Sequence, residues 1–237
     1  MKTIVHRADS RGHFNHGWLN TYHTFSFADY CDSERVHFGM LRVLNDDTVR
    51  EGKGFEKHPH DNMEIVSILL KGAVEHEDSM HNKELIRAGE IQVMSAGTGV
   101  FHSEFSKKGF EDASFLQIWI FPNKENVTPR YDRISLADVA KPDELYQILS
   151  PNPNDQGVWI YQQAWFHFGD LSAGWQGEYT LKGEDSGVYF FVIEGEVEVA
   201  GQSLDRRDGL GVWDTQSIPI KVTQPAKLLL MEVPMNR

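Results

Sequence analysis

Short apolar runs, separated by Gly, Pro, Asn and Asp, recur along the whole chain. Five of them have the length of a β-strand and lie at residues 64–70, 90–94, 115–121, 188–193 and 228–233. Runs of this length with turn-forming residues between them are typical of a sandwich or a barrel of β-strands. Helical periodicity is sparse, and its best candidate, within residues 135–149, is divided by Pro142. The pattern therefore predicts an all-β fold.

The two halves of the chain share a β pattern. The sequence ILLKGAVE at residues 68–75 resembles FVIEGEVE at 191–198, and AGEIQVM at 88–94 resembles DGLGVWD at 208–214. Each half thus predicts a strand, a glycine turn and a strand, followed by a further glycine turn and strand. Because one such unit cannot bury its apolar face alone, the repeat predicts two related β-modules. The proline-rich stretch 122–157 is the predicted connection, with a candidate hairpin at SPNPNDQG.

Composition narrows the class of protein. Of the 237 residues 40% are hydrophobic and 24% charged, which is the balance of a folded globular chain. The 23 basic residues face 35 acidic ones, a net charge of −12, so direct binding to nucleic acid is not expected. Cys31 is the single cysteine, which excludes an internal disulfide and a thiolate zinc finger. The sequence shows neither a signal peptide nor an apolar run of about 20 residues, so we expect a soluble, cytoplasmic protein without membrane contact.

The first candidate for chemistry is the sequence HPH. His58 and His60 are two residues apart, so in a strand they share a face at roughly 6.6 Å. The same face is predicted to continue through Asn62, Glu64 and the apolar residues 66, 68 and 70. Metal-capable side chains would then lead into an apolar row. This arrangement predicts a metal at one end of a barrel whose remainder is core.

A second candidate segment, AGEIQVMSAGTGVFHSEF at residues 88–105, combines a glycine-rich turn with His102 and Glu104. These two side chains again share one strand face. Imidazole and carboxylate ligands suit a divalent first-row metal such as Fe, Mn, Ni, Cu or Zn. Four protein ligands on an octahedral ion would leave two positions for water, dioxygen or a chelating substrate. HPH alone is weak evidence, because two strand histidines are usually structural, but the combination of both segments is much stronger.

The second half of the chain serves as an internal control. Gly72 can be aligned with Gly195, and Gly89 with Gly209, so that each predicted ligand acquires a counterpart. The residues at the four corresponding positions are Leu181, Gly183, Val222 and Gln224, which do not form a competent ligand set. His167 is the only histidine of this half, and we interpret it as having no function. The repeat thus predicts a metal in the first module and none in the second.

The spacing of these residues resembles the two cupin motifs. It reads Gly52-x5-His58-x-His60-x3-Glu64-x7-Gly72 and then Gly89-x5-Ser95-x-Gly97-x4-His102. It departs from the usual cupin pattern by one extra residue before Gly72, by Ser95 where proline is common, and by two extra residues before His102. These departures, together with RGHFNHGWLNTYHTFSFADY, FGMLRVLNDD, VEHEDSM and MSAGTGVFHSE, resemble the pirin branch of the cupins. The resemblance is close over the first ~130 residues and loose afterwards.

The resemblance implies a bicupin, with two antiparallel β-barrel (jelly-roll) domains. The first, residues 1–130, would bind one metal ion, and the second, residues 131–237, would be metal-free and structural. The ligand set of pirins carries over to His58, His60, His102 and Glu104. In many other cupins the ligand carboxylate is that of the first motif, here Glu64, and strand parity alone permits either. We expect Glu104 to be the ligand and Glu64 to orient a histidine by a hydrogen bond.

Three further residues are candidates for the pocket. His23 lies in YHTFSF, where it shares a strand face with Phe25 and Phe27, and Met94 lies within one of the predicted strands. We expect His23, Phe25 and Met94 to line a pocket near the metal, with ordinary core packing as the alternative. His76 is expected in a solvated loop.

Bacterial pirins of this size have been assayed as quercetin 2,3-dioxygenases, so the resemblance implies a dioxygenase acting on a flavonol and dioxygen with release of carbon monoxide. A metal-bound flavonol would lose its proton to Glu104 or Glu64 acting as the catalytic base. Fe(II) is the expected ion, with Zn, Mn, Ni, Co or Cu as alternatives. A second hypothesis is a non-enzymatic, metal- or redox-sensing protein that binds a transcription regulator. A third is a cupin with another small-molecule substrate, because fold and metal site do not fix the substrate.

Overall fold

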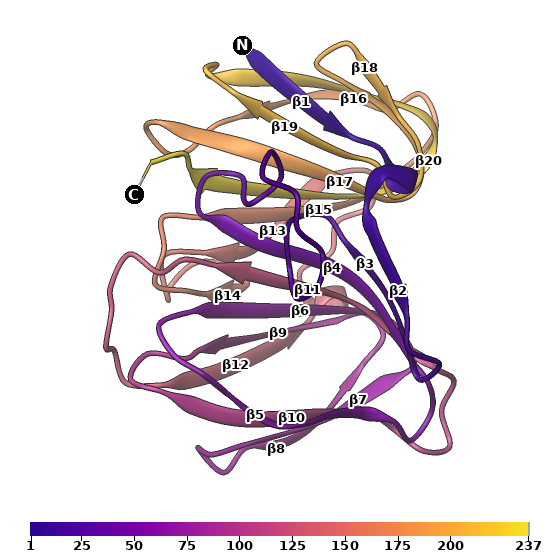
Figure 1. Ribbon diagram of the computed structural model, residues 1–237. Helices are drawn as coiled ribbons and strands as arrows, with labels where there is room; N and C mark the ends of the chain where they lie inside the picture. The colour runs from indigo at the N-terminus through magenta and orange to yellow at the C-terminus, as the bar shows by residue number, and fades with distance from the viewer. Residues whose placement is uncertain (237) are drawn as a thin grey trace.

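Two β-barrels packed against each other make up the molecule (Figure 1). The computed structural model describes residues 1–236. Within these residues the only helices are two 3₁₀ turns, η1 (Ala8–Ser10) and η2 (Leu136–Asp138). The prediction of an all-β bicupin is thus confirmed. No helix in the described part of the chain is long and apolar enough to cross a membrane.

The first barrel consists of a seven-stranded sheet and a four-stranded sheet. The larger sheet has the order β12-β9-β6-β11-β4-β3-β2 and is antiparallel throughout. Its strands are β2 (Gly12–Asn15), β3 (Leu19–His23), β4 (Leu41–Val49), β6 (Glu64–Lys71), β9 (Glu90–Ser95), β11 (Ala113–Ile120) and β12 (Arg130–Ser135). The smaller sheet has the order β5-β10-β7-β8, with β5 (Gly54–His60), β7 (Ala73–Asp78), β8 (Lys83–Arg87) and β10 (Val100–Ser106).

The second barrel is formed by a nine-stranded sheet that curls on itself. Its path is β1-β19-β17-β20-β15-β13-β14, with β16 paired to β20 and β18 to β17. Its strands are β1 (Lys2–His6), β13 (Leu145–Ser150), β14 (Val158–Trp159), β15 (Trp165–Leu171), β16 (Gln176–Thr180), β17 (Ser186–Val199), β18 (Gln202–Leu204), β19 (Gly209–Trp213) and β20 (Ser217–Pro234). Gly195 has a φ of 84°, and the register shifts on both sides of it, so β17 bends there without ending.

All five predicted strands are present, and the weak helix candidate within 135–149 does not form a helix of that length. The chain forms only the turn η2 there, capped by the Ser135 side chain, and then β13. Pro142 interrupts any longer helix. Tyr146 and Ile148 point into the core between the barrels, and β13 completes its hydrogen bonds against β15. Tertiary pairing therefore decides the conformation of this segment.

A large apolar core joins the two barrels. It includes Val66 and Ile68 from the first barrel and Phe191 and Leu229 from the second. The N-terminal strand β1 crosses to the second barrel, where it pairs with β19, and β12, from the middle of the chain, pairs with β9 of the first barrel. The predicted boundary at residue 130 stays a prediction, and Arg237 lies outside the described residues.

Candidate metal centre

The inner face of the four-stranded sheet carries most of the chemistry. β5 and β10 are antiparallel neighbours, with His58 opposite His102. β7 pairs with the other edge of β10, which sets His76 opposite Glu104 and Asp78 opposite His102. Residues that are opposite each other in antiparallel strands lie on the same face. Three strands thus bring side chains from distant parts of the sequence to one patch.

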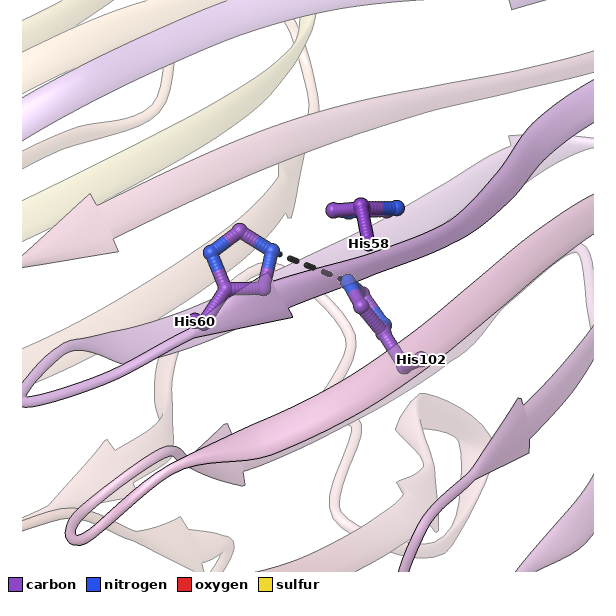
Figure 2. A group of neighbouring side chains, drawn as sticks. All are labelled: His58, His60 and His102. Carbon is purple, nitrogen blue, oxygen red and sulfur yellow. Dashed lines mark hydrogen bonds between the residues drawn. The ribbon is translucent and has the colours of Figure 1, made fainter.

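The three histidines of the predicted ligand set converge (Figure 2). One imidazole nitrogen from each of His58, His60 and His102 lies within 4.8 Å of the other two. Nε2 of His60 is 3.0 Å from Nε2 of His102. The ring centroid of His58 is 4.9 Å from that of His60 and 4.4 Å from that of His102. His102 is buried, whereas His58 and His60 are half-buried at the end of the barrel.

The electrostatics of this group keep the imidazoles of His60 and His102 neutral. Burial, together with the neighbouring His102 and His58, lowers the pKa of His60 to about 3. Burial also lowers the pKa of His102 to about 3, with contributions from His58 and His76. A neutral imidazole offers a nitrogen lone pair, which a metal requires. Nδ1 of His102 is buried without a hydrogen-bond partner among the described residues. Three imidazoles beside a carboxylate fit a divalent first-row ion.

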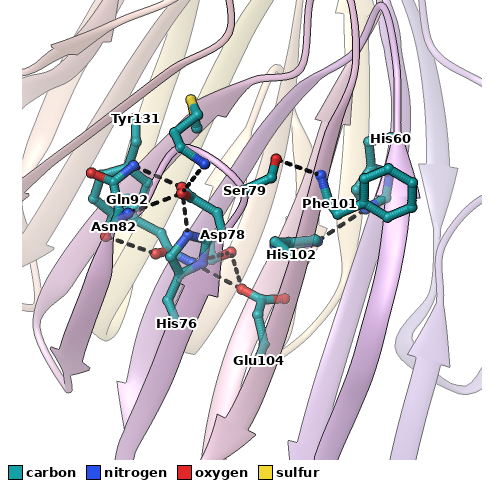
Figure 3. A network of polar contacts seen from close by, with 12 residues as sticks. His60, His76, Asp78, Ser79, Asn82, Gln92, Phe101, His102, Glu104 and Tyr131 are labelled. Carbon is teal, nitrogen blue, oxygen red and sulfur yellow. Dashed lines mark hydrogen bonds and ion pairs between the residues drawn. The ribbon is translucent and has the colours of Figure 1, made fainter.

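Glu104 is buried and held by three side chains of the larger sheet, of which Figure 3 labels Gln92. Gln92 Nε2 donates to its Oε1 at 2.9 Å, and Gln117 Nε2 donates to its Oε2 at 3.0 Å. Ser67 lies between the two glutamines and donates to the Gln117 side-chain oxygen at 2.9 Å. Gln92 in turn accepts a hydrogen bond from the Tyr131 hydroxyl. The carboxylate orientation is therefore fixed by side chains of the larger sheet, whereas the histidines belong to the smaller one.

His76 is a residue that the sequence reasoning missed. We expected it in a solvated loop, but it lies buried in β7, and its ring stacks on Tyr131. Together with His102 and Glu104 it forms a second group of donor atoms within 4.8 Å. His102 and Glu104 thus belong to one contiguous patch with His58 and His60, although which of them ligate stays a prediction. The alternation in AVEHED, with Val74, His76 and Asp78 on one face, was the available signal.

Asp78 orients His76 from behind. Its Oδ2 lies 3.2 Å from His76 Nε2 and accepts from the Asn82 side chain at 2.8 Å. Burial opposes the charge of Asp78, but these hydrogen bonds hold its pKa below the ordinary value. Hydrogen bonds of this kind fix ring orientation near a metal site.

Glu64 lies away from this patch, which corrects the predicted strand face. The chain turns at residues 61–63, where Asn62 has a φ of 41°, and passes from the smaller sheet into the larger one. The continuous face predicted from His58 through Glu64 is therefore broken. The Glu64 carboxylate accepts from Ser95 Oγ at 2.7 Å, and burial raises its pKa to about 7. Its neighbours are Tyr161 and Arg130, so the carboxylate beside His102 is that of Glu104 and not that of Glu64.

The three predicted pocket residues have different surroundings. Met94 packs with Trp119, whose ring centroid is 4.9 Å from that of His60. His23 is buried further from His60 than Trp119 is. Its ring contacts Phe27, and Phe27 in turn contacts Trp119. Phe25 instead packs in the core between the barrels, 5.4 Å from the Tyr189 ring, because β3 ends at His23 and the face is not continued. The pocket prediction for Phe25 is therefore corrected.

Comparison with known proteins agrees with the fold. The family model for pirin matches residues 5–120, and a model for the quercetinase C-terminal cupin domain matches residues 147–233. The chain is 40% identical over 230 residues to the quercetin 2,3-dioxygenase of Escherichia coli K12, covering 97% of this chain and 98% of that protein. The chain belongs to the pirin family.

Solved structures and further relatives extend this result. The bacterial pirin YhhW of Escherichia coli in complex with nickel(II) has a TM-score of 0.93 and 38% identity, covering 98% of this pirin and 99% of that chain. A pirin-like protein of Caulobacter vibrioides is 36% identical, covering 94% of this chain and 96% of that protein. Members of the family thus include proteins named as dioxygenases and one that has been seen with a bound metal.

Proposed function

We propose that this pirin is a metal-dependent dioxygenase that opens the ring of a flavonol of the quercetin type. The observation that supports this most directly is the patch on β5 and β10, where three imidazoles converge and one of them, that of His102, adjoins a carboxylate held in place by glutamines. The name of the Escherichia coli relative supplies the substrate class. Fe(II) is the proposed ion, although the donor set also accepts the nickel seen in the YhhW complex.

His58, His60, His102 and Glu104 would hold the ion. Bound there, a divalent ion supplies Lewis acidity to the hydroxyl and carbonyl oxygens of a flavonol. The chain contributes orientation and a proton acceptor. Glu104 is the carboxylate on this patch, so it is the residue proposed to accept the substrate proton. The hydrogen bonds from Gln92 and Gln117 keep its oxygens in place while it does so.

An apolar wall beside His60 suits an aromatic substrate. It consists of buried Met94 with Trp119, Met63 and Met80, which are partly exposed. Methionine and tryptophan side chains favour contact with flat aromatic rings. Trp119 also contacts the His60 ring edge-on, which limits the rotation of that ligand. A flavonol could therefore present its oxygens to the ion while its rings lie on this wall.

The test is oxygen uptake with quercetin by protein loaded separately with Fe(II) or Ni(II). We expect turnover in wild type and a loss of at least ~100-fold in His58→Ala, because ligand removal exceeds the 10–100-fold cost of disturbing a ligand's support. His58 is half-buried, so this variant is expected to fold. His16→Ala, at an exposed histidine of the same barrel, is the control and should keep wild-type turnover. Equal turnover in wild type and His58→Ala would refute the proposal.

The predicted cytoplasmic location is proposed on the sequence alone. The predicted absence of nucleic-acid contact likewise rests on the net charge of −12.

A further inference from the structure

A cavity of about 970 Å³ lies between the two barrels, away from the histidines. Ile68 of β6 lines it, whereas its neighbour Ser67 belongs to the polar group that surrounds Glu104. Successive residues of a strand point to opposite faces. The cavity and the candidate metal centre are therefore on opposite faces of the seven-stranded sheet. The volume is within the range of small-molecule sites, ~300–1,000 Å³.

The cavity has an apolar floor. It is formed by side chains of the core that joins the barrels, namely Ile68, Leu136, Tyr146, Phe168 and Ile193, with Leu70 beside them. Both barrels contribute to this floor, so it exists only because they are packed together. A floor of this kind accommodates the hydrocarbon or aromatic body of a ligand.

One wall of the cavity is cationic. Arg11 and Arg207 are 9% and 8% exposed, and both approach the same oxygen of Asp46, at 3.2 Å and 3.5 Å. The Arg11 guanidinium also lies over the Tyr22 ring, 4.8 Å from its centroid. Arg206 completes the wall through an ion pair with Glu194 at 2.7 Å.

The charges of this wall do not balance. Three guanidinium groups are opposed by two carboxylates, those of Asp46 and Glu194, which leaves one positive charge in excess. Arg207 is the least compensated, since its contact with Glu194 is 3.8 Å long and its Nη1 has no hydrogen-bond partner in the described part of the chain. Buried donors in native proteins are almost always satisfied by protein or ordered water, so the unpaired nitrogen marks the Arg207 guanidinium as undercompensated. Burial also lowers the pKa of Arg207, as expected of a guanidinium that lacks compensation.

We propose that this cavity binds an organic monocarboxylate, with its carboxylate on the arginine wall and its apolar body on the floor. One negative charge matches the single excess positive charge, and a carboxylate offers the planar pair of oxygens that guanidinium groups prefer. The rest of the rim carries Lys71 and Lys227 against Asp9, Glu111, Asp112 and Asp170. Because this rim is acidic on balance, a phosphate dianion is disfavoured. The proposal is independent of the activity proposed for the metal centre.

Calorimetric titration with three probes tests the proposal on the full chain. We expect 2-naphthoate to bind with one site, its neutral amide 2-naphthamide to bind at least ~10-fold more weakly, and inorganic phosphate to bind more weakly than 2-naphthoate. Equal affinity for the acid and the amide would overturn the role of the arginines. Tighter binding of phosphate would overturn the ligand class, and no binding of 2-naphthoate to wild type would overturn the site.

Substitutions in the arginine wall test whether 2-naphthoate binds in this cavity. Arg207→Met should weaken 2-naphthoate ~10-fold or more, and Arg207→Lys should restore part of that loss. Because Arg207 is buried, its variants are compared with wild type by thermal unfolding. If the Arg207 variants do not fold, Arg206→Met tests the site instead. The Arg206 side chain is 58% exposed, so this variant is expected to fold, and it should weaken 2-naphthoate binding ~3-fold. Unchanged affinity in Arg206→Met and in every folded Arg207 variant would overturn the assignment.

Two controls separate this cavity from the rest of the surface. Arg133→Met, on the first barrel beside Glu84 and Glu90, should bind 2-naphthoate as wild type does. His58→Ala and metal-free protein should also bind it with unchanged affinity. Binding that disappears in His58→Ala would instead place the probe at the candidate metal centre and contradict the proposal.

Discussion

The two barrels use the same three strand positions for opposite purposes. In the first, Ser67 is paired across the sheet with Gln92 on one side and Gln117 on the other, and these three residues surround Glu104. With Gly72 aligned on Gly195, the corresponding row of the second barrel is Phe190, Leu210 and Leu230. All three are fully buried in its apolar core. A polar row that supports a carboxylate in one barrel is thus hydrocarbon in the other.

The second barrel also contains a buried carboxylate, but its environment differs. Glu232 accepts hydrogen bonds from the Tyr179 hydroxyl at 2.7 Å and from the backbone N–H groups of Lys182 and Gly183. His167 contacts the same hydroxyl at 3.3 Å. Among residues 1–236 no group of three metal-capable donors converges in this barrel. The first barrel therefore differs from the second in bringing histidine nitrogens beside its buried acid.

Removal of a histidine should produce the largest difference between the barrels. His102→Ala takes away the imidazole that is common to both donor groups, so metal affinity should fall by more than ~100-fold. His167→Ala removes the only histidine of the second half and should leave the metal content of the protein unchanged. Elemental analysis of both variants after equal exposure to Fe(II) or Ni(II) gives the comparison. A parallel loss of metal in His167→Ala would mean that the second barrel also contributes a ligand.

Glu232→Leu should reveal that the carboxylate of the second barrel is structural. It leaves three donors without an acceptor, the buried hydroxyl of Tyr179 and the partly buried backbone N–H groups of Lys182 and Gly183. At about 1 kcal/mol each the loss is about 3 kcal/mol, or a fall in Tm of roughly 6–12 °C. Thermal unfolding measures this, while metal content should stay at the wild-type value. A variant as stable as wild type would show that these hydrogen bonds contribute little.

The pH dependence of stability should report on the same cluster. Burial, followed by the charge of Lys182, lowers the pKa of His167 from its ordinary 6.5 to about 4. As the pH falls, His167 is therefore protonated in the unfolded chain before it is protonated in the folded one. The stability that neutral His167 contributes is complete above pH 6.5 and is lost as the pH falls toward 4. Between pH 7 and pH 4.5 the free energy of unfolding of His167→Gln should fall by about 2 kcal/mol less than that of wild type. Urea unfolding at both pH values measures this difference. An identical change in the free energy of unfolding in wild type and in His167→Gln would exclude His167 as the group that titrates.

Periodicity predicted the strands well because burial on one or both faces leaves a clear pattern. The segments 64–70 and 115–121 were recognisable from their apolar runs, and both lie in the middle of the larger sheet. β12 and β13 were missed because they are short and lie in the proline-rich stretch. Their conformation depends on partners that are distant in sequence, and local pattern does not contain that information.

For the candidate site, the sequence predicted the donors better than their surroundings. His58, His60 and His102 were found from their spacing alone. Glu64 and Phe25 were misplaced because strand parity was extended across turns at which the chain changes its face. Gln92 and Gln117 carry no motif, and only the fold brings their amides to Glu104. Residues that act through a neighbour leave little trace in the order of amino acids.

Gln117→Leu tests whether the glutamines support Glu104. Leucine is chosen because the second barrel has a leucine, Leu230, at the corresponding position. It removes one of the two amide donors to Glu104, so the carboxylate loses a fixed direction but remains on β10. The expected fall in metal affinity is about 10-fold, equivalent to about 1.4 kcal/mol, because outer hydrogen bonds to ligands contribute on this scale. Competition with a chromophoric chelator measures the affinity. Gln163→Leu, at an exposed glutamine, is the control. If Gln117→Leu binds metal as tightly as wild type, the polar row of the first barrel would be packing and not support, and the contrast with Phe190, Leu210 and Leu230 would lose its functional meaning.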